Sequence, residues 1–212
     1  MTIFRPFAAL CGLLTALVLT GAAQAACPTG LPPGVYCGDK DPAAALAGTY
    51  KLDPMHAGVI ARVSHIGYSM SIFRFDTAQA TLVWDPDHLD KSSFNAAVDT
   101  GSVATNVPGF AKEIAGTYLK SADFPKATFV STAFRRIDPL HGEIDGQFTL
   151  LGKSKPVTFK VELIGAGKGF GHPRLGAQAV AWINPQDYGM SPFFLDPIQL
   201  VIDAEFEQTP AK

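Results

Sequence analysis

The stretch IDGQFTL at Ile144–Leu150 is followed, after a short turn, by VTFKVEL at Val157–Leu163, and both stretches alternate between apolar and polar residues. Apolar side chains at every second position lie on one face of a β-strand. The turn residues Gly152–Lys155 separate the two stretches by a distance that suits an antiparallel hairpin. The sequence here therefore predicts two paired strands with one buried face.

The same alternation runs through most of the chain between Tyr50 and Glu207. Further strand-like runs lie at Gly58–Ile66, Met70–Asp76, Gln79–Trp84, Phe94–Asp99, Thr128–Phe134, Ala177–Ile183 and Ile198–Phe206. One-sided polarity in so many runs predicts an antiparallel sheet with a single buried face. Because closure removes the exposed edges of a sheet, we expect an all-β fold, an antiparallel β-barrel of about eight strands.

One segment between the strands has a helical period. Its apolar residues are three or four positions apart: Val107, Phe110, Ile114 and Tyr118. This spacing predicts one short α-helix, with Asn106 as its N-cap and Pro108 in its first turn. Its apolar face has two interpretations, an ordinary core contact or a cover over one end of the barrel.

The inward-facing positions of the expected barrel are rich in small residues. They include Ala61, Ala96, Gly146, Ala177, Ala179, Ala181 and Ala204. Small side chains can leave empty volume, which costs stability unless an apolar molecule fills it. The alternative is that the many phenylalanines of the chain fill this volume from across the core. The sequence pattern favours neither interpretation.

The first residues are typical of a secretory signal peptide. Arg5 supplies a charge, Phe7–Leu19 a short apolar core, and Ala23–Ala25 a cleavage site of small residues. We therefore expect residues 1–25 to be removed and the protein to be periplasmic; an uncleaved membrane anchor is the alternative.

The formal net charge of −2, without a basic cluster, argues against nucleic-acid binding. No later apolar segment is long enough to span a bilayer. The sequence leaves the oligomeric state open between a monomer and a dimer.

Two cysteines remain after the expected cleavage, Cys27 and Cys37. An even pair in an exported protein predicts a disulfide, although two free thiols or a metal or redox pair are alternatives. The bridge would close an arm at residues 26–48 that is rich in proline and glycine. Within this arm, Asp41 and Pro42 predict the start of a short helix that ends near Gly48.

Residues suited to catalysis or metal binding are few. His56 and His65 are candidates for metal ligands or for a catalytic base, but zinc needs three or four clustered ligands. No serine lies in a Gly-x-Ser-x-Gly motif. We therefore expect no metal, no cofactor and no catalytic residue, with His56 and His65 hydrogen-bonded to the backbone or to Asp53.

Several segments resemble the YceI-like family of exported, lipocalin-like, polyisoprenoid-binding proteins, over about Tyr50 to Phe206. They are Tyr50–His56 with His65, Arg74-Phe75, Ser92-Ser93, Asp99, Ser102, Thr105-Asn106, Leu119–Phe124, Ala127–Thr132, Gly146–Leu150, Gly152, Lys155–Val157, Ile183-Asn184 and Asp187–Met190. Each segment is weak evidence alone, but their order and spacing are specific. The chain departs from the family at Ala61, where a large aromatic residue is usual, and near Pro185, where an arginine is missing.

The resemblance implies an extended, lipocalin-like barrel at residues 49–208, with a helix packed near it and no catalysis. It also implies a long isoprenoid-type ligand, a polyprenyl lipid or a quinone, inside the barrel. The candidate ligand-binding residues are Phe73, Phe75, Trp84, Phe110, Ile114, Tyr118, Phe129, Phe148, Phe159, Trp182, Tyr188 and Met190. Arg62, Arg74 or Lys112 could meet a polar head group. The alternatives are a small enzyme that uses His56 or His65 as base, and a structural or stress protein with a filled core.

Overall fold

A computed structural model describes residues 27–210 of the chain. The expected signal peptide and its cleavage site lie outside the described residues. The chain divides into two units, Met1–Gly30 and Leu31–Lys212, and every helix and strand described below belongs to the second. Cys27 and Cys37 are disulfide-bonded, as the even pair predicts.

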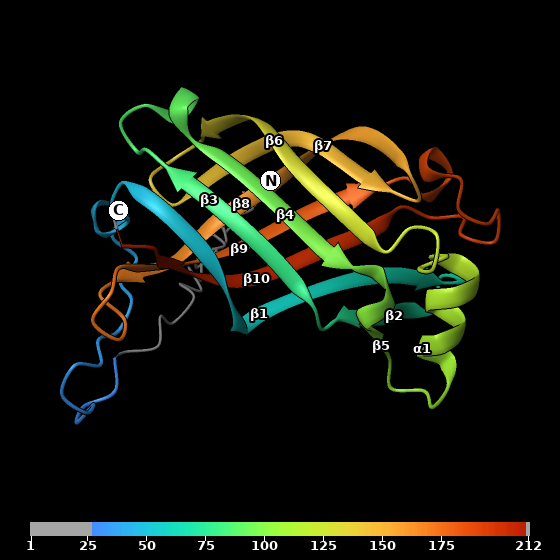
Figure 1. Cartoon of the computed structure of the whole chain (residues 1–212), viewed down its shortest axis with the longest axis horizontal. Helices are drawn as coiled ribbons and strands as arrows, with labels where there is room; N and C mark the ends of the chain where they lie inside the picture. The colour runs from blue at the N-terminus through green and yellow to red at the C-terminus, as the bar shows by residue number, and fades with distance from the viewer. Residues whose placement is uncertain (1–26, 211–212) are drawn as a thin grey trace, which may run out of the picture. The chain divides into compact units, whose positions relative to one another are not determined.

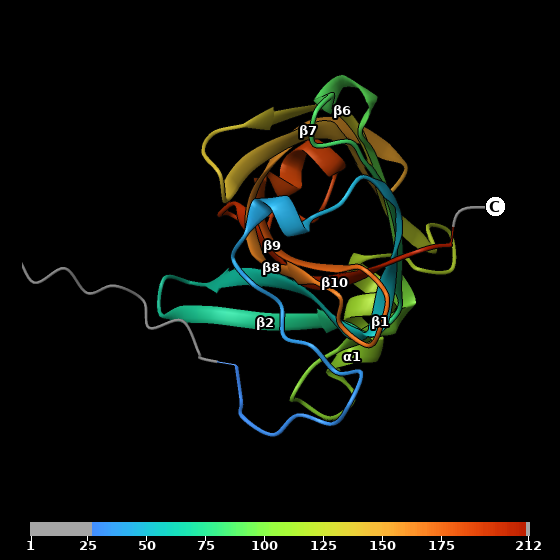
Figure 2. The same ribbon diagram turned by 90° about the vertical axis from the view of Figure 1, so that its left-hand side faces the viewer.

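Ten strands form one antiparallel sheet that closes on itself (Figures 1 and 2). They are β1 (Gly48–His65), β2 (Ser69–Phe75), β3 (Ala78–Trp84), β4 (Ser93–Asp99), β5 (Val103–Ala104), β6 (Lys126–Arg136), β7 (His141–Leu150), β8 (Lys153–Gly167), β9 (Arg174–Ile183) and β10 (Ile198–Gln208). The ring runs β1-β3-β4-β6-β7-β8-β9-β10 and returns to β1 through the β10–β1 pairing. The predicted antiparallel barrel of about eight strands is therefore confirmed.

Different parts of the long strand β1 pair with different neighbouring strands. Its first residues, Gly48–Lys51, pair with β3, whereas Val59–His65 pairs with β2, and β2 pairs in turn with the short β5. Opposite β10, the register shifts between Leu52 and Ala57. Residues 53–56 consequently bulge out of the strand, because they have only one residue of β10 opposite them.

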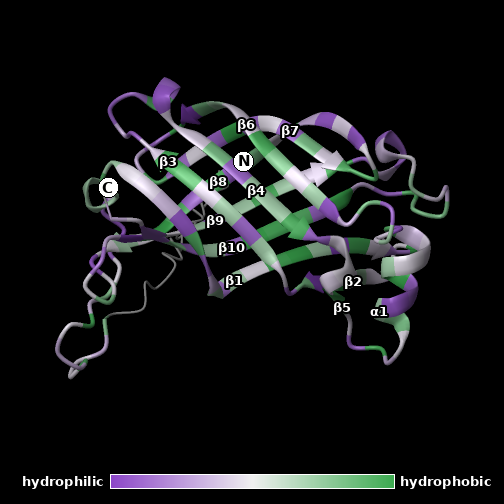
Figure 3. Ribbon diagram, viewed as in Figure 1, coloured by the Kyte–Doolittle hydropathy of each residue, from purple (hydrophilic) through white to green (hydrophobic). Residues whose placement is uncertain are grey.

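The alternation read from the sequence determines which side chains are buried. In β8, Val157 and Phe159 are buried while Thr158 and Lys160 are exposed. Figure 3 shows the same alternation as bands of hydrophobic and hydrophilic colour along the strands. The inner face forms two apolar clusters, one around Phe129 beside the mid-chain helix and one around Tyr50 at the other end.

The mid-chain helix is present but begins later than predicted. α1 spans Phe110–Glu113 and continues as a turn of π-helix, η4 (Ile114–Tyr118). Its N-cap is Gly109, in the left-handed conformation with φ of 80°, so the prediction of Asn106 as cap and Pro108 in the first turn was wrong. The side chain of Thr105 instead forms a local turn with Val107. Proline and asparagine are common in such turns as well as at helix starts, which is why the sequence misled.

The remaining helical turns are short. One 3-10 turn, η1 (Pro42–Ala44), precedes β1, and three more lie between strands: η2 (Leu89–Lys91), η3 (Thr100–Ser102) and η5 (Pro185–Tyr188). Asp41 caps η1 as predicted, since its carboxylate accepts a hydrogen bond from the Ala43 amide at 2.9 Å. η1 is shorter than expected, because Gly48 already belongs to β1. Across residues 27–210, none of the helices has both the length and the apolar character that a membrane crossing requires.

Candidate functional site

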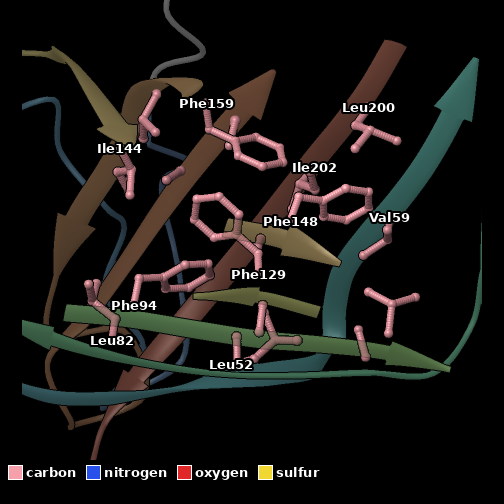
Figure 4. A pocket seen from close by; sticks show the side chains of 18 of the residues that line it. Leu52, Val59, Leu82, Phe94, Phe129, Ile144, Phe148, Phe159, Leu200 and Ile202 are labelled. Atoms are coloured by element: carbon pink, nitrogen blue, oxygen red, sulfur yellow. The ribbon is translucent and has the colours of Figure 1, made fainter. Parts of the chain in front are cut away.

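The barrel encloses an apolar cavity of about 350 Å³. Strands from all around the ring contribute side chains to it, and Figure 4 shows Phe94, Phe129, Phe148 and Phe159 with aliphatic residues around one space. A structural protein with a filled core was one alternative from the sequence, and a cavity of this size does not fit it. Ligand pockets in proteins start at about 300 Å³, so the barrel has room for a small apolar molecule.

Six of the seven small inward residues fall into two groups, and the seventh, Ala181, is buried without lining the cavity. Five of them line the cavity: Ala61, Ala96, Ala177, Ala179 and Ala204. At Gly146, by contrast, an added Cβ would lie 2.4 Å from Cζ of Phe129, so an aromatic ring already occupies that space. Both interpretations of the small residues are therefore correct, each in a different part of the barrel.

Four phenylalanine rings meet across the middle of the barrel. Phe94 of β4 lies 6.3 Å from Phe129 of β6 and 6.0 Å from Phe206 of β10, measured between ring centroids. Phe159 of β8 lies 5.0 Å from Phe129 in an edge-to-face contact. All four line the cavity, so the aromatic cluster narrows the space in which a ligand can lie.

One end of the cavity is closed by the mid-chain helix and by the loop before β10. Ile114, Tyr118 and Leu119 line this end together with Met190 and Phe194. The rings of Tyr118 and Phe194 meet edge to face at 5.2 Å. The helix face combines the two interpretations, because Ile114 and Tyr118 line the cavity whereas Phe110 makes an ordinary core contact.

Charged residues border the other end of the cavity, near η1. The indole of Trp84 donates a hydrogen bond to the Ala45 carbonyl there at 3.1 Å, and Figure 2 shows η1, in blue, at the near end of the barrel. The charged lining residues belong to the end of β6, the β6–β7 turn and the start of β7: Arg135, Arg136, Asp138, His141 and Glu143.

The sequence missed these charged residues and favoured others. Arg62, Arg74 and Lys112 do not line the cavity; Arg62 donates to Gln199 at 2.6 Å, and Arg74 pairs with Asp76 at 2.5 Å. In β6 the register shifts by one residue between Ser131 and Ala133, so the side chains beyond it change faces. A bulge of this kind leaves little signal in an alternating sequence.

Nine of the twelve candidate ligand-binding residues line the cavity: Phe73, Phe75, Trp84, Ile114, Tyr118, Phe129, Phe148, Phe159 and Met190. Three do not. Phe110 packs outside the lining against Phe73 at 6.1 Å, and Tyr188 is buried against Phe148 at 5.6 Å, where burial raises its pKa to about 12. Trp182 is 56% exposed, because it lies between the inward-facing Ala181 and Ile183 and therefore points outward.

The bulge in β1 carries a charged network outside the cavity. Asp53 accepts hydrogen bonds from Nη1 of Arg174 at 2.7 Å and from the amide of Met55 at 3.0 Å, and it pairs with Nδ1 of His56 at 2.9 Å. The Arg174 guanidinium, and then His56, lowers the pKa of Asp53 to about 2. The hydrogen bond to Asp53 in turn raises the pKa of His56 above its ordinary value.

This network has donor atoms that could bind a metal ion, but the Arg174 guanidinium already pairs with its carboxylates. Asp53, His56 and Glu205 bring one ligand atom each to within 4.8 Å of one another. Arg174 bonds both carboxylates, with Glu205 at 3.1 Å, so its guanidinium already occupies the position from which a metal ion would bind them. The expected hydrogen bond between His56 and Asp53 is therefore confirmed as part of an ion-pair network. Neither His56 nor His65 lines the cavity, so neither is placed to act as a base on a molecule inside it.

Comparison with known proteins agrees with this geometry. The YceI-like domain model matches residues 50–206. Protein YceI of Escherichia coli O157:H7 is 34% identical over 150 residues, which cover 69% of this chain and 78% of that protein. The crystal structure of BcnA from Burkholderia cenocepacia superposes with a TM-score of 0.65 at 20% identity, covering 73% of this chain and 98% of that one.

A second solved structure, a polyisoprenoid-binding domain from Saccharophagus degradans, superposes with a TM-score of 0.57 at 12% identity. It covers 77% of this chain and 100% of that domain. At such low identity these two structures support the barrel fold alone. The match to the domain model and the 34% identity to protein YceI show which family the chain belongs to. The chain belongs to the YceI-like family.

Proposed function

We propose that the protein binds an apolar, isoprenoid-type molecule, a polyprenyl lipid or a quinone, inside the barrel and carries or stores it in the periplasm. The observation that carries this proposal is the apolar cavity of about 350 Å³ inside a closed barrel. The ligand class is supported by the similarity to a polyisoprenoid-binding domain, and the compartment by the expected signal peptide. Binding is favoured over catalysis by His56 or His65, because neither of these residues lines the cavity.

The driving force would be burial of hydrocarbon. Each methylene taken from water contributes about 0.8 kcal/mol, and the cost of ordering ligand and protein reduces the net affinity well below the sum. Filling the cavity also removes the cost of an empty apolar space. An apolar chain without a precise polar anchor can therefore bind, and charged residues at the η1 end can meet a head group.

The cavity limits the length of chain that the barrel encloses as it stands. A cavity of about 150 Å³ accommodates benzene, so scaling by volume gives the 350 Å³ here room for roughly 14 carbon atoms, about three isoprene units. A longer chain must displace the aromatic cluster or extend beyond one end. We therefore expect affinity to rise from geraniol to farnesol and to level off at longer prenols.

The two tryptophans provide a test with a built-in control. Trp84 lines the cavity and Trp182 lies on the outside, and the chain contains no other tryptophan. In Trp182→Phe, the remaining Trp84 emission should change in a saturable way as farnesol is added. In Trp84→Phe, the remaining Trp182 emission should stay constant. Circular dichroism would check that both variants keep the barrel.

Native mass spectrometry of freshly purified protein would test the same binding without a reporter. We expect a one-to-one adduct with a co-purified prenyl lipid or quinone, or uptake of added farnesol after solvent extraction. A protein that is always empty and binds no prenol of any length would refute the proposed function. Affinity that keeps rising up to decaprenol would refute only the length limit, and would show that the barrel expands.

A further inference from the structure

Two loops next to the closed end of the cavity expose large apolar side chains. In the β1–β2 turn, Ile66 is 72% and Tyr68 88% exposed. In the loop before β10, Phe193 is 71% and Leu195 87% exposed. We refer to these four residues as the apolar tip. Clustered exposed apolar residues mark surfaces that meet another protein or a membrane.

The strand register places both loops at the same end of the barrel. Arg62 of β1 pairs with Gln199 of β10. Ile66 is four residues beyond Arg62, and Leu195 is four residues before Gln199. At about 3.3 Å per residue, both therefore lie within roughly 15 Å of that pair. The loop before β10 also forms the right-hand end of Figure 1, beside α1.

The backbone conformation of Ile66 is unfavourable for a β-branched residue, so the protein keeps an apolar side chain there at a cost in conformational energy. Ile66 has φ of 52° and Gly67 has φ of 76°, and the Tyr68 amide donates to the His65 carbonyl at 3.0 Å. Two left-handed residues in succession form a turn that favours asparagine, aspartate or glycine at its first position. A β-branched residue is strained there, and such strain tends to persist where function requires it.

Charge distinguishes the two ends of the barrel. The turn at the closed end holds Lys153, whose ammonium lies near Gly189, because an added Cβ on Gly189 would be 2.6 Å from it. The loops at the η1 end are densely charged, with six aspartates against three lysines and the two arginines Arg135 and Arg136, whereas Asp196 is the one charged residue in the two loops of the apolar tip. The apolar tip can therefore enter an apolar environment at a lower desolvation cost than the densely charged η1 end.

We propose that the apolar tip is a membrane-docking surface that enters the interfacial region of a lipid bilayer. Aromatic and aliphatic side chains at loop ends suit that region, where tyrosine and phenylalanine bury their rings among the head groups. The loop that carries Phe193 also carries Phe194, which lines the cavity against Tyr118. Docking would thus hold the closed end of the cavity at the membrane. The proposal goes beyond ligand binding, and its test needs no ligand.

Flotation with vesicles of phosphatidylcholine and phosphatidylglycerol tests this surface on the full mature chain. We expect the wild-type protein to float with the vesicles, and Phe193→Ser combined with Leu195→Ser to weaken that affinity by about tenfold or more. The matched control is Ile137→Ser in the β6–β7 turn at the other end, where Ile137 is 63% exposed. This control should bind vesicles like the wild type.

Ile66→Asn separates docking from stability. Asparagine suits the first position of this turn, so the variant should melt at the same temperature as the wild type or higher, yet bind vesicles more weakly. Wild-type protein that does not float, or an Ile137→Ser variant that loses as much binding as the tip variants, would overturn the proposal. Tip variants that abolish a dimer in light scattering, without any vesicle binding in the wild type, would instead assign the surface to a second copy of this chain.

Discussion

At the scale of single residues, Gly146 shows how the interior is packed. An added Cβ would lie 2.4 Å from Cζ of Phe129 and 2.5 Å from the carbonyl oxygen of Val130, and the second contact involves backbone that cannot rotate away. We therefore expect Gly146→Ala to lower the free energy of unfolding by about 1–3 kcal/mol, the usual cost of overpacking. Urea denaturation would measure it.

The control for this substitution is Gly116→Ala in the turn η4. Nothing lies within 4 Å of an added Cβ at Gly116, and alanine is the better helix former, so this change should stabilise by up to about 1 kcal/mol. The same loss of stability in both variants would show that the Phe129 contact is not the cause.

These residues also show what alternation can and cannot predict. It correctly places Gly146, Ala179 and Phe129 on the inner face, and it places Trp182 on the outer face, where the structure has it. Trp182 is a candidate ligand contact in the sequence analysis, although its parity in the strand points it outward. Whether an inward alanine or glycine borders empty space depends on residues across the barrel, and no local pattern records that distance.

At the scale of elements, the bulge in β1 makes stability depend on pH. The pKa of Asp53 is about 2 in the folded protein against an ordinary value of 3.8, so its ionised form stabilises the fold above the ordinary value. This contribution is lost as the pH falls from about 4 to about 2. The pKa of His56 is raised, so its contribution is present at low pH and is lost as the pH rises through that raised value.

Asp53→Asn tests this account of the bulge. Asparagine still accepts the hydrogen bond from the Met55 amide but leaves Arg174 without its first carboxylate. We expect a melting temperature lower by roughly 2–4 °C at pH 6 and a smaller further loss below pH 4 than in the wild type. Thermal melts across this range measure both. Parallel pH profiles for the two proteins would contradict the assignment.

Bulges are also where prediction of the elements failed. The strands and their antiparallel order follow from alternation, because each strand must bury one face. The register shifts after Leu52 in β1 and after Ser131 in β6 do not, since each inserts residues without changing the composition of the strand. The shift in β6 turns Arg136 towards the cavity, whereas Arg62 and Arg74 have the outward parity of β1 and β2 and do not line it.

At the scale of the whole molecule, the empty volume inside the barrel lowers the stability of the fold but leaves room for a ligand. An eight-stranded barrel is just wide enough to be filled by side chains or to hold one small ligand. Here the aromatic cluster fills the middle, while alanines on β1, β4, β9 and β10 leave the rest open. If that space exists for a ligand, filling it from the protein should raise stability and remove binding at the same time.

Ala179→Leu tests this exchange, because Ala179 lines the cavity between Val161 and Ile202 of the neighbouring strands. We expect the ligand-free variant to be more stable by about 0.5–2 kcal/mol, as is common when cavities are filled, and to take up less farnesol. Val180→Leu, on the outer face of the same strand, should change neither quantity. Urea denaturation and native mass spectrometry of the same samples would measure both effects. A variant that is destabilised yet binds farnesol normally would mean that the ligand does not lie beside Ala179. The leucine side chain would then overpack the barrel without displacing the ligand.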